Sequence, residues 1–375
     1  MTASPPPPIP MLDIVRLHAP LAGALRRAFD ETLAGGRFIG GPAVERFEAE
    51  LADHVEARRA VGVSSGTDAL LVALMALGVR PGDEVITSPY TFFATAGAIA
   101  RLGARPVFAD IEPDGLNIDP AAVEAAVTGA TVGIVPVHLF GQTAALDPLV
   151  ELAERRGLWV LEDAAQAIGA RHRGRPAGAI GDAGIYSFFP AKNLGALGDA
   201  GAVVTGDDAL ADRIRALRQH GGARRYEHDE VGGNFRLDAL QAAFLSVKLP
   251  HLAGWEEGRR RVAGRYRAGL GDVGGLELPE ERAGRRHVFN QHVVRVGGGR
   301  RDALRGALAD AGVASAIYYP RPLHLQPCFA GLGLREGDLP EAERAARETL
   351  AIPVDPLLSA DDQDRVIAAV RGALG

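Results

Sequence analysis

One stretch of sequence points to the fold of this chain: Ser187-Phe188-Phe189-Pro190-Ala191-Lys192-Asn193-Leu194-Gly195. In it, Lys192 follows an aromatic pair and a proline and precedes a run of glycines, a setting that can hold an amine inside a cleft. Most lysines are solvated surface residues, so this stretch alone is weak evidence for catalysis. An acidic segment upstream strengthens it, because Glu162 and Asp163 follow the apolar run 158–160. A carboxylate at the end of a buried strand, with a lysine on a later loop, is the pairing that a pyridoxal phosphate enzyme requires.

Around this stretch, short apolar runs alternate with helical patterns. The candidate strands are residues 60–63, 84–87, 105–109, 133–137, 159–162, 184–187 and 202–205. Helical spacing of apolar residues covers 68–77, 94–102 and 146–155. This alternation predicts an α/β fold with a mostly parallel, seven-stranded sheet flanked by helices. Ligands of such sheets bind at the carboxyl ends of the strands.

The sequence pattern divides the chain into three parts. Residues 1–10 carry prolines where a signal peptide has an apolar core, and we expect a disordered lead-in there. Residues 11–248 are predicted to form a large cofactor-binding domain that begins with helices. Residues 249–375 turn towards arginine and helix, which predicts a smaller C-terminal α+β domain. The glycine-rich turn 35–42 is either a connector or a loop that faces the substrate.

Composition narrows the class of protein. The 375 residues are 47% hydrophobic and 23% charged, as in an ordinary globular protein. A net charge of -6 gives no support to a nucleic-acid partner. Cys328 is the single cysteine, which excludes an internal disulfide and fits a reducing cytosol. No apolar run approaches the roughly 18 residues of a membrane span. We therefore expect a cytoplasmic protein with neither a membrane nor a nucleic-acid partner, and no metal site.

A phosphate site is predicted where the first strand runs into a helix through Ser64-Ser65-Gly66-Thr67. Free backbone N–H groups and the helix dipole there favour an anion, and Thr67 adds a hydroxyl. Ser187, five residues before Lys192, could reach the same phosphate. The alternative is a plain helix cap by Ser65 or Thr67.

The remaining chemistry rests on Asp163, Lys192 and Phe92. A pyridine nitrogen stays protonated only if an anion lies against it, and a protonated ring is the electron sink of this cofactor. Lys192 would form a Schiff base, and its freed amine could then move protons. Phe92 follows a strand and is the candidate for stacking on the ring, although core packing is the commoner fate of an aromatic. Asp163 could instead cap a helix that begins near Ala164.

These segments occur in the order seen in the DegT-type (DegT/DnrJ/StrS) sugar aminotransferases, which the chain resembles from about Ile9 to its C-terminus. The matching motifs are Gly66-Thr67, Thr91-Phe92, Glu162-Asp163-Ala164-Ala165-Gln166, Ser187 to Gly195, and Gly233-Asn234-Phe235-Arg236-Leu237-Asp238. That family consists of fold type I pyridoxal phosphate enzymes that act on nucleotide-linked keto sugars. The resemblance therefore implies the same fold and cofactor.

The resemblance also implies a role for each matching residue. Lys192 forms the Schiff base, Asp163 pairs with the pyridine nitrogen and Gln166 lies near the ring hydroxyl. Asn234 matches a residue that such enzymes lend to the phosphate of the neighbouring subunit, which implies a homodimer with two shared active sites. The full set of implied cofactor-binding residues is Gly66, Thr67, Phe92, Asp163, Gln166, Ser187, Lys192 and Asn234.

Two segments bear on the substrate. Residues 318–326 resemble the substrate-contacting segment of family members that aminate the sugar C3 position, so Tyr319 and His324 are predicted substrate residues. A proline-stiffened loop with a structural His324 is the alternative. Arg236 would face a sugar carboxylate or a diphosphate, or would pair with an acid such as Asp238. Gly233 stands where many relatives have an aromatic residue, which leaves the neighbouring part of the substrate pocket open.

The predicted reaction moves an amino group from glutamate to a nucleotide-diphosphate keto sugar, with C3 favoured, and makes an amino sugar for glycan or natural-product biosynthesis. Glutamate is implied by the resemblance alone, and glutamine is the alternative donor. A 4-keto sugar and a non-catalytic, regulatory relative are alternative interpretations. Lys192 argues against the dehydratases of this fold, in which a histidine replaces the lysine. A nicotinamide dehydrogenase is disfavoured because no G-x-G-x-x-G follows the first strand. The sequence leaves open UDP or dTDP and any assembly beyond a dimer.

Overall fold

Seven strands form the central sheet of the structure, a computed structural model that describes residues 7–375 apart from 223 and 225. They are β1 (Arg59–Val63), β2 (Glu84–Thr87), β3 (Arg105–Phe108), β4 (Thr131–Val135), β5 (Trp159–Asp163), β8 (Ala183–Ser187) and β9 (Gly201–Thr205). Each lies within two residues of a predicted strand. The predicted seven-stranded sheet is confirmed.

The strand order is β1-β9-β8-β5-β4-β2-β3. β9 runs antiparallel to its neighbours β1 and β8, whereas the pairs β8·β5, β5·β4, β4·β2 and β2·β3 are parallel. The prediction of a mostly parallel sheet is therefore correct. Because β1 also runs with the parallel set, the carboxyl ends of β1, β2, β4, β5 and β8 share one edge of the sheet.

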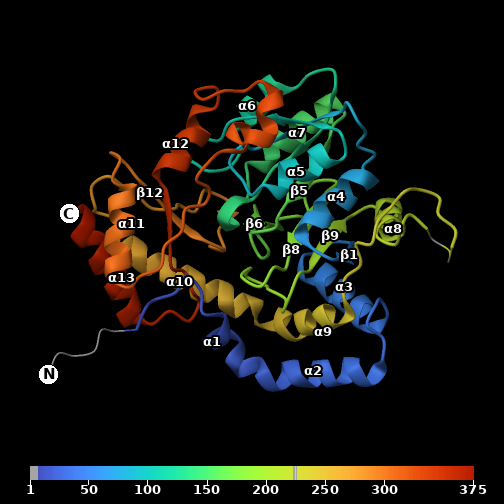
Figure 1. Ribbon diagram of the computed structural model, residues 1–375, viewed down its shortest axis with the longest axis horizontal. Coiled ribbons are helices and arrows are strands. Elements are labelled where there is room, and N and C mark those ends of the chain that lie inside the picture. The colour runs from blue at the N-terminus through green and yellow to red at the C-terminus, as the bar shows by residue number, and fades with distance from the viewer. Residues whose placement is uncertain (1–6, 223, 225) are drawn as a thin grey trace.

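Helices cover both faces of this sheet (Figure 1). One face carries α4 (Gly66–Ala76), α5 (Ala94–Arg101) and α8 (Asp208–Leu217), and the other carries α3 (Pro42–His54), α6 (Pro120–Ala126), α7 (Leu146–Arg156) and α9 (Ala239–Lys248). The side chains of successive strand residues lie on opposite faces of the sheet. Val85 packs against α4 and α5, and Ile86 packs against α6 and α7. Burial on both faces explains why the strands are continuous apolar runs.

A smaller domain lies beside the sheet. Its three-stranded sheet has the order β10 (Leu276–Glu277), β12 (His292–Val296), β13 (Thr349–Ile352) and is antiparallel. Its helices are α10 (Leu252–Leu270), α11 (Arg301–Asp310), α12 (Pro340–Glu348) and α13 (Ala360–Leu374), with the 3-10 turns η4 (Leu323–Leu325) and η5 (Pro327–Leu332). The domain boundary predicted after residue 248 falls between α9 and the turn η3 (Leu249–His251). It stays a prediction.

The remaining elements connect or flank these domains. A third sheet pairs β11 (Arg285–Arg286) with β6 (Arg171–His172) and β7 (Arg175–Pro176), and η2 (Leu139–Gly141) follows β4. At the N-terminus, α1 (Ile14–His18), η1 (Ala19–Leu21) and α2 (Ala22–Gly35) run beneath α9 in Figure 1. Leu25 and Ala28 of α2 pack against Ala243 and Phe244 of α9. In the described part of the chain, no helix combines the length and hydrophobicity needed to span a membrane.

The N-terminal segment corrects one expectation. Residues 1–6 of the predicted disordered lead-in lie outside the described residues, but Ile9 is buried at 2% exposure. Its N–H donates to the Gly312 carbonyl at 2.8 Å, and its own carbonyl accepts from the Ala314 N–H at 2.9 Å. The prediction of a disordered lead-in is therefore wrong at Ile9. The Ile9 side chain packs into the core of the small domain, and the local sequence does not indicate this contact.

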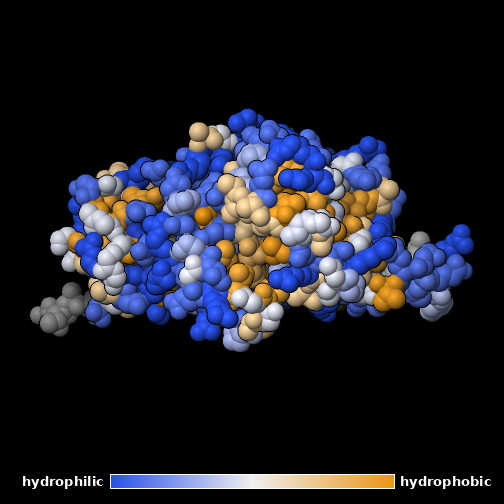
Figure 2. Space-filling view, turned by 90° about the horizontal axis from the view of Figure 1, so that it is seen from above, coloured by the Kyte–Doolittle hydropathy of each residue, from blue (hydrophilic) through white to orange (hydrophobic). Residues whose placement is uncertain are grey.

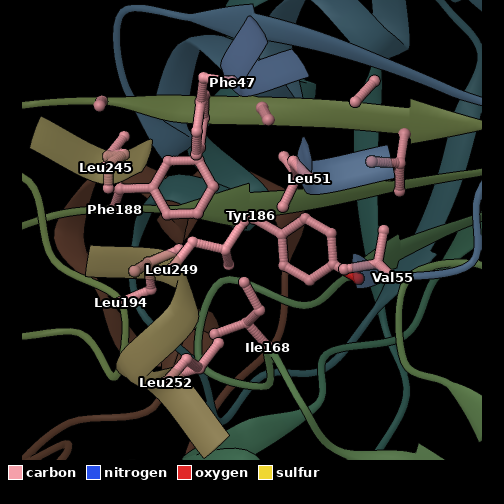
Figure 3. Close-up of a cluster of buried hydrophobic side chains, with 14 of the residues drawn as sticks. Phe47, Leu51, Val55, Ile168, Tyr186, Phe188, Leu194, Leu245, Leu249 and Leu252 are labelled. Atoms are coloured by element: carbon pink, nitrogen blue, oxygen red, sulfur yellow. The ribbon is translucent and has the colours of Figure 1, made fainter. Parts of the chain in front are cut away.

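The core beneath the Lys192 loop joins α3, α9 and the sheet (Figure 3). Phe188 and Leu194, on either side of Lys192, are both fully buried in it. The Phe188 ring meets the edge of Phe47 from α3, with centroids 5.4 Å apart. The loop that carries Lys192 is thus fixed at both ends by packing. The Lys192 side chain is not part of this core and lines the cavity described below.

Candidate active site

A cavity of about 450 Å³ opens at the shared carboxyl edge of the sheet. It is lined from the loops after β1, β2, β4, β5 and β8 and by two tyrosines of the small domain. The predicted site residues that it brings together are Gly66, Thr67, Phe92, Asp163, Gln166, Ser187, Lys192 and Tyr319. Residues far apart in the sequence thus meet where ligands of parallel sheets bind.

Asp163 is the buried anion of this cavity. Its Oδ2 accepts a hydrogen bond from Thr95 Oγ1 at 2.8 Å, and its Oδ1 accepts from the Ala165 N–H at 3.2 Å. Burial raises the pKa of Asp163, against the opposing effects of these donors and of the Lys192 charge. A cation placed against the carboxylate would remove that penalty. The environment therefore suits a positively charged ligand group such as a pyridinium.

Glu162, next to Asp163, points to the other side of the sheet because side chains alternate along a strand. Its carboxylate accepts from His138 Nε2 at 2.8 Å and from backbone N–H groups of the segment 178–181. Burial alone would raise the pKa of Glu162, but these hydrogen bonds bring it below its usual value. This network fixes the end of β5 and, with it, the backbone of Asp163.

Lys192 faces Asp163 from the loop after β8. The Lys192 N–H donates to the Phe189 carbonyl at 2.8 Å, and the Ala196 N–H closes the loop on the Phe188 carbonyl at 2.7 Å. Burial lowers the pKa of the Lys192 amine to about 8, and the Asp163 charge works in the opposite direction. A useful fraction of the amine is therefore neutral near pH 8 and able to attack a carbonyl carbon.

A concave anion cradle lies where α4 begins. Ser65 caps the helix through its Oγ, which accepts from the Asp68 N–H at 3.0 Å. The first N–H groups of a helix, here at Gly66 and Thr67, have no partner within the helix. A Cβ at Gly66 would stand 2.6 Å from Ser187 Cβ, so glycine is required for the two loops to meet. Ser65 thus caps the helix, as the alternative interpretation of this segment predicted, and the free N–H groups of Gly66 and Thr67 can still bind a phosphate.

These residues fit pyridoxal phosphate. The helix start with Thr67 and Ser187 can hold a phosphate, Asp163 can pair with the ring nitrogen, and Lys192 can reach an aldehyde. The Phe92 ring is 57% exposed at the cavity, which leaves it free to cover a planar ring. The cavity volume is within the range of small-molecule sites.

Gln166 and Tyr319 form the side of the cavity next to the small domain. Gln166 Oε1 accepts from the Phe140 N–H at 2.7 Å, and its Nε2 donates to the Tyr319 hydroxyl at 3.2 Å. Tyr90 holds the neighbouring residue in place by donating its hydroxyl to the Tyr318 carbonyl. Burial raises the pKa of Tyr319, so its hydroxyl stays protonated and can donate to a ligand.

The structure does not bring His324 to the cavity. Its side chain is buried in η4, with Nε2 3.1 Å from Glu343 Oε1 of α12. The predicted substrate role of His324 is therefore wrong within this chain. The alternative of a structural histidine is the one that the packing supports, because its imidazole pairs with a carboxylate inside the small domain.

Asn234 and Arg236 also lie outside the cavity. Both lie between α8 and α9, where the backbone of Asn234 pairs with that of Gln219. Arg236 lines a separate hollow with Gln219 and His220, and its backbone pairs with Val63. Its predicted contact with the substrate is therefore not made within one chain. Asn234 is exposed, and its predicted contact with a second subunit stays a prediction.

Two residues that position Asp163 were missed by the sequence analysis. Thr95 and His138 hold, respectively, its carboxylate and the adjoining Glu162. Thr95 had a usable signal, because it lies in the first turn of the helix that follows Thr91-Phe92 at the same edge of the sheet. His138 had none, since it meets β5 only through tertiary pairing of the chain after β4.

Comparison with known proteins agrees with this geometry. Residues 22–371 match the DegT/DnrJ/EryC1/StrS aminotransferase family. The chain is 50% identical over 364 residues to the "Pleiotropic regulatory protein" of Geobacillus stearothermophilus, covering 96% of this chain and 97% of that one. It is 44% identical over 365 residues to the dTDP-3-amino-3,4,6-trideoxy-alpha-D-glucose transaminase of Streptomyces venezuelae, covering 97% and 96%. The crystal structure of S. venezuelae DesV in complex with a ketimine intermediate superposes with a TM-score of 0.96 at 44% identity and 98% coverage of both chains.

Proposed function

Because the chain belongs to the DegT/DnrJ/EryC1/StrS aminotransferase family, we propose that it uses pyridoxal phosphate to move an amino group from glutamate to the C3 ketone of a nucleotide-diphosphate sugar. The observation that carries the proposal is that Asp163 and Lys192 face one cavity, which also holds the cradle at Gly66 and Ser187. That set of residues supplies a partner for each polar end of the cofactor.

The cofactor, when bound, supplies an aldehyde that condenses with amines and a ring that accepts electrons from carbon. Asp163 would keep the ring nitrogen protonated, which makes such a ring a better electron acceptor. Lys192 is the residue that would hold the cofactor aldehyde until the amine of glutamate takes its place. Its freed Nζ would then carry one proton between the two carbons that flank the transferred nitrogen.

The same residues act in reverse in the second half of the reaction. One water is consumed in the first half and supplies the keto oxygen of 2-oxoglutarate, and the carbonyl oxygen of the sugar ketone leaves as water in the second half. Lys192 again moves one proton between carbons, so it ends unchanged. Tyr319 and Gln166 line the side of the cavity towards the small domain, where their hydrogen bond fixes the orientation of both side chains.

The C3 position is supported by two observations. The name of the S. venezuelae relative is that of a transaminase for a sugar with its amine at C3. Tyr319, from the segment predicted to contact the substrate in C3-specific members, lines the cavity. The name of the G. stearothermophilus relative favours a second candidate, a regulatory protein. We rank it lower, since a protein without turnover has no need for Asp163 and Lys192 in one cavity.

A homodimer with shared sites, located in the cytoplasm, is part of the proposal. Support comes from Asn234, which is exposed and does not line the cavity of its own chain. Phe189, beside the cavity, is 52% exposed, and a second subunit would cover such a ring. Figure 2 shows apolar side chains gathered in the middle of one face. Mixing inactive Lys192→Ala chains with weak Asn234→Ala chains should restore part of the activity if the sites are shared.

An absorption titration tests the proposed function. Protein loaded with pyridoxal phosphate should show a visible band that glutamate bleaches and that one keto sugar restores, with 3-keto and 4-keto sugars compared as both dTDP and UDP derivatives. Restoration by a 4-keto sugar alone would move the ketone position. A protein that shows no band after incubation with the cofactor would put the regulatory candidate first.

A further inference from the structure

The chain contains only two lysines, Lys192 and Lys248, among its 41 lysine and arginine residues. All the other basic residues are arginines. A lysine in this chain therefore marks a place where a compact ammonium is needed in place of a planar guanidinium group. Lys192 is explained by its chemistry. Lys248 does not line the cavity and is completely buried, which is rare for a lysine without a partner.

Lys248 lies between two neutral acceptors. Its Nζ donates to the Gly195 carbonyl and lies 2.6 Å from His18 Nε2. In the described part of the chain, no carboxylate forms an ion pair with it. Burial lowers the pKa of Lys248 to about 8, and burial together with the charge of Lys248 lowers the pKa of His18 to about 4. Near neutral pH, His18 is therefore uncharged and its Nε2 can accept from the ammonium.

Gly195 ends the loop that carries Lys192. A Cβ at Gly195 would collide with the Pro190 carbonyl oxygen, so the two limbs of the loop touch there. Helix α9 holds this limb twice: Lys248 binds the Gly195 carbonyl, and Gln241 Oε1 accepts from the Leu197 N–H at 2.8 Å. Figure 3 shows Leu245 of the same helix, followed by Leu249 of η3, beside Phe188 and Leu194 at the base of the loop. The position of Lys192 therefore depends on α9.

His18 belongs to an N-terminal strap, residues 9–18, that starts on the small domain. Ile9 pairs with Gly312 and Ala314 there, and the Asp13 N–H donates to Asp355 Oδ2 at 2.7 Å. Figure 1 shows this segment running from the small domain to α1 beneath α9. The small domain also supplies Tyr319 to the cavity. One chain of contacts thus joins the small domain to the Lys192 loop.

We propose that Lys248 is a positioning residue for Lys192, which fixes the Gly195 carbonyl and, through His18, ties the Lys192 loop to the strap and the small domain. The proposal rests on Lys192 being the cofactor lysine. It does not give Lys248 a chemical step, because its amine is outside the cavity. Loss of the tie should disturb the alignment of Lys192 during proton transfer and leave substrate binding largely intact.

The test compares four variants: Lys248→Met, His18→Leu, His18→Gln and, as a control, His251→Leu at an exposed histidine that contacts Trp255. Amide hydrogen exchange of residues 188–197 is measured on the protein itself, so this arm reads the loop whether or not the proposed sugar reaction is correct. Steady-state kcat and KM for glutamate and the visible band of the bound cofactor are measured in parallel.

We expect Lys248→Met to speed exchange in the loop and to lower kcat by about tenfold, with KM for glutamate within about twofold. His18→Leu should change loop exchange and kcat in the same direction but by less. His18→Gln should keep both close to the values of the unaltered protein, because its amide oxygen can accept from Lys248. Should Lys248→Met fail to fold, the His18 pair decides. Unchanged loop exchange and kcat in His18→Leu, or a change in KM alone, would overturn the proposal.

Discussion

Lys192 and Lys248 are both lysines with a pKa lowered to about 8, yet they do different things. Lys192 faces the Asp163 carboxylate in an open cavity, whereas Lys248 is enclosed between a carbonyl and an imidazole. The comparison teaches that a lowered pKa does not by itself make a lysine reactive. Access for a carbonyl compound and an anion aimed at the cofactor ring are what distinguish the catalytic site.

The largest effect is expected at the reactive lysine. Lys192→Ala should lower kcat by about a thousandfold or more, because both the attachment of the cofactor and the proton transfer use this amine. Turnover of glutamate and keto sugar measures the loss. Lys248→Met serves as the matched comparison and should lower kcat by only about tenfold. Equal losses in the two variants would erase the distinction between the two lysines.

The anion that sets Lys192 apart is the next target. Asp163→Asn keeps the shape of the side chain and removes its charge, so we expect kcat to fall by about a hundredfold to a thousandfold. The hydrogen bond from Thr95 to this residue can still form, which keeps the fold intact. Rate measurements and the absorption band of the loaded protein report the change. Near-normal kcat in this variant would mean that the ring nitrogen needs no anion.

Because the two lysines share a pKa of about 8, a pH profile tests which of their amines a carbonyl compound can reach. Only the neutral amine attacks an aldehyde, so the rate at which pyridoxal phosphate binds covalently to the apoprotein should rise about tenfold from pH 7 to pH 9, with its midpoint near the Lys192 pKa of about 8. Stopped-flow absorbance follows this rate. The Lys248→Met profile should keep the same midpoint. A midpoint that moves with Lys248 would place the reacting amine there.

The smallest effect on activity is expected at His324. Its imidazole pairs with Glu343 in the small domain, so His324→Ala should lower the free energy of unfolding by about 1–3 kcal/mol. We expect kcat for the sugar to change less than threefold, roughly the range of a residue outside the site. Urea unfolding and steady-state kinetics separate the two. A large loss of kcat with normal stability would return His324 to the substrate site.

The strands and most of the cavity could be predicted because each piece is local. A strand, a turn and a helix start bring Gly66 and Asp163 to the same edge of a parallel sheet whatever the rest of the chain does. The segment 318–326 shows the limit. It sends Tyr319 to the cavity and His324 into the core, and no local pattern tells which side of an irregular loop faces the ligand.

The tie at Lys248 could not be found from local patterns either, since its partners His18 and Gly195 are distant in the chain. Composition nevertheless carried a signal. In a chain whose other basic residues are all arginines, the two lysines are exceptional, and one lies on the loop while the other, fully buried, binds its Gly195 carbonyl. No comparable signal in the sequence distinguishes Ile9. Only its backbone hydrogen bonds with the small domain show that it is part of the folded structure.

The most direct measurement uses this scarcity of lysines. The protein is incubated with pyridoxal phosphate, reduced with borohydride, digested and mapped by mass spectrometry, so that the reduced cofactor can be attached to only two side-chain amines. We expect the added mass on the peptide that contains Lys192 and none on the peptide that contains Lys248. Attachment to Lys248, or to neither lysine, would contradict the assignment of the active site.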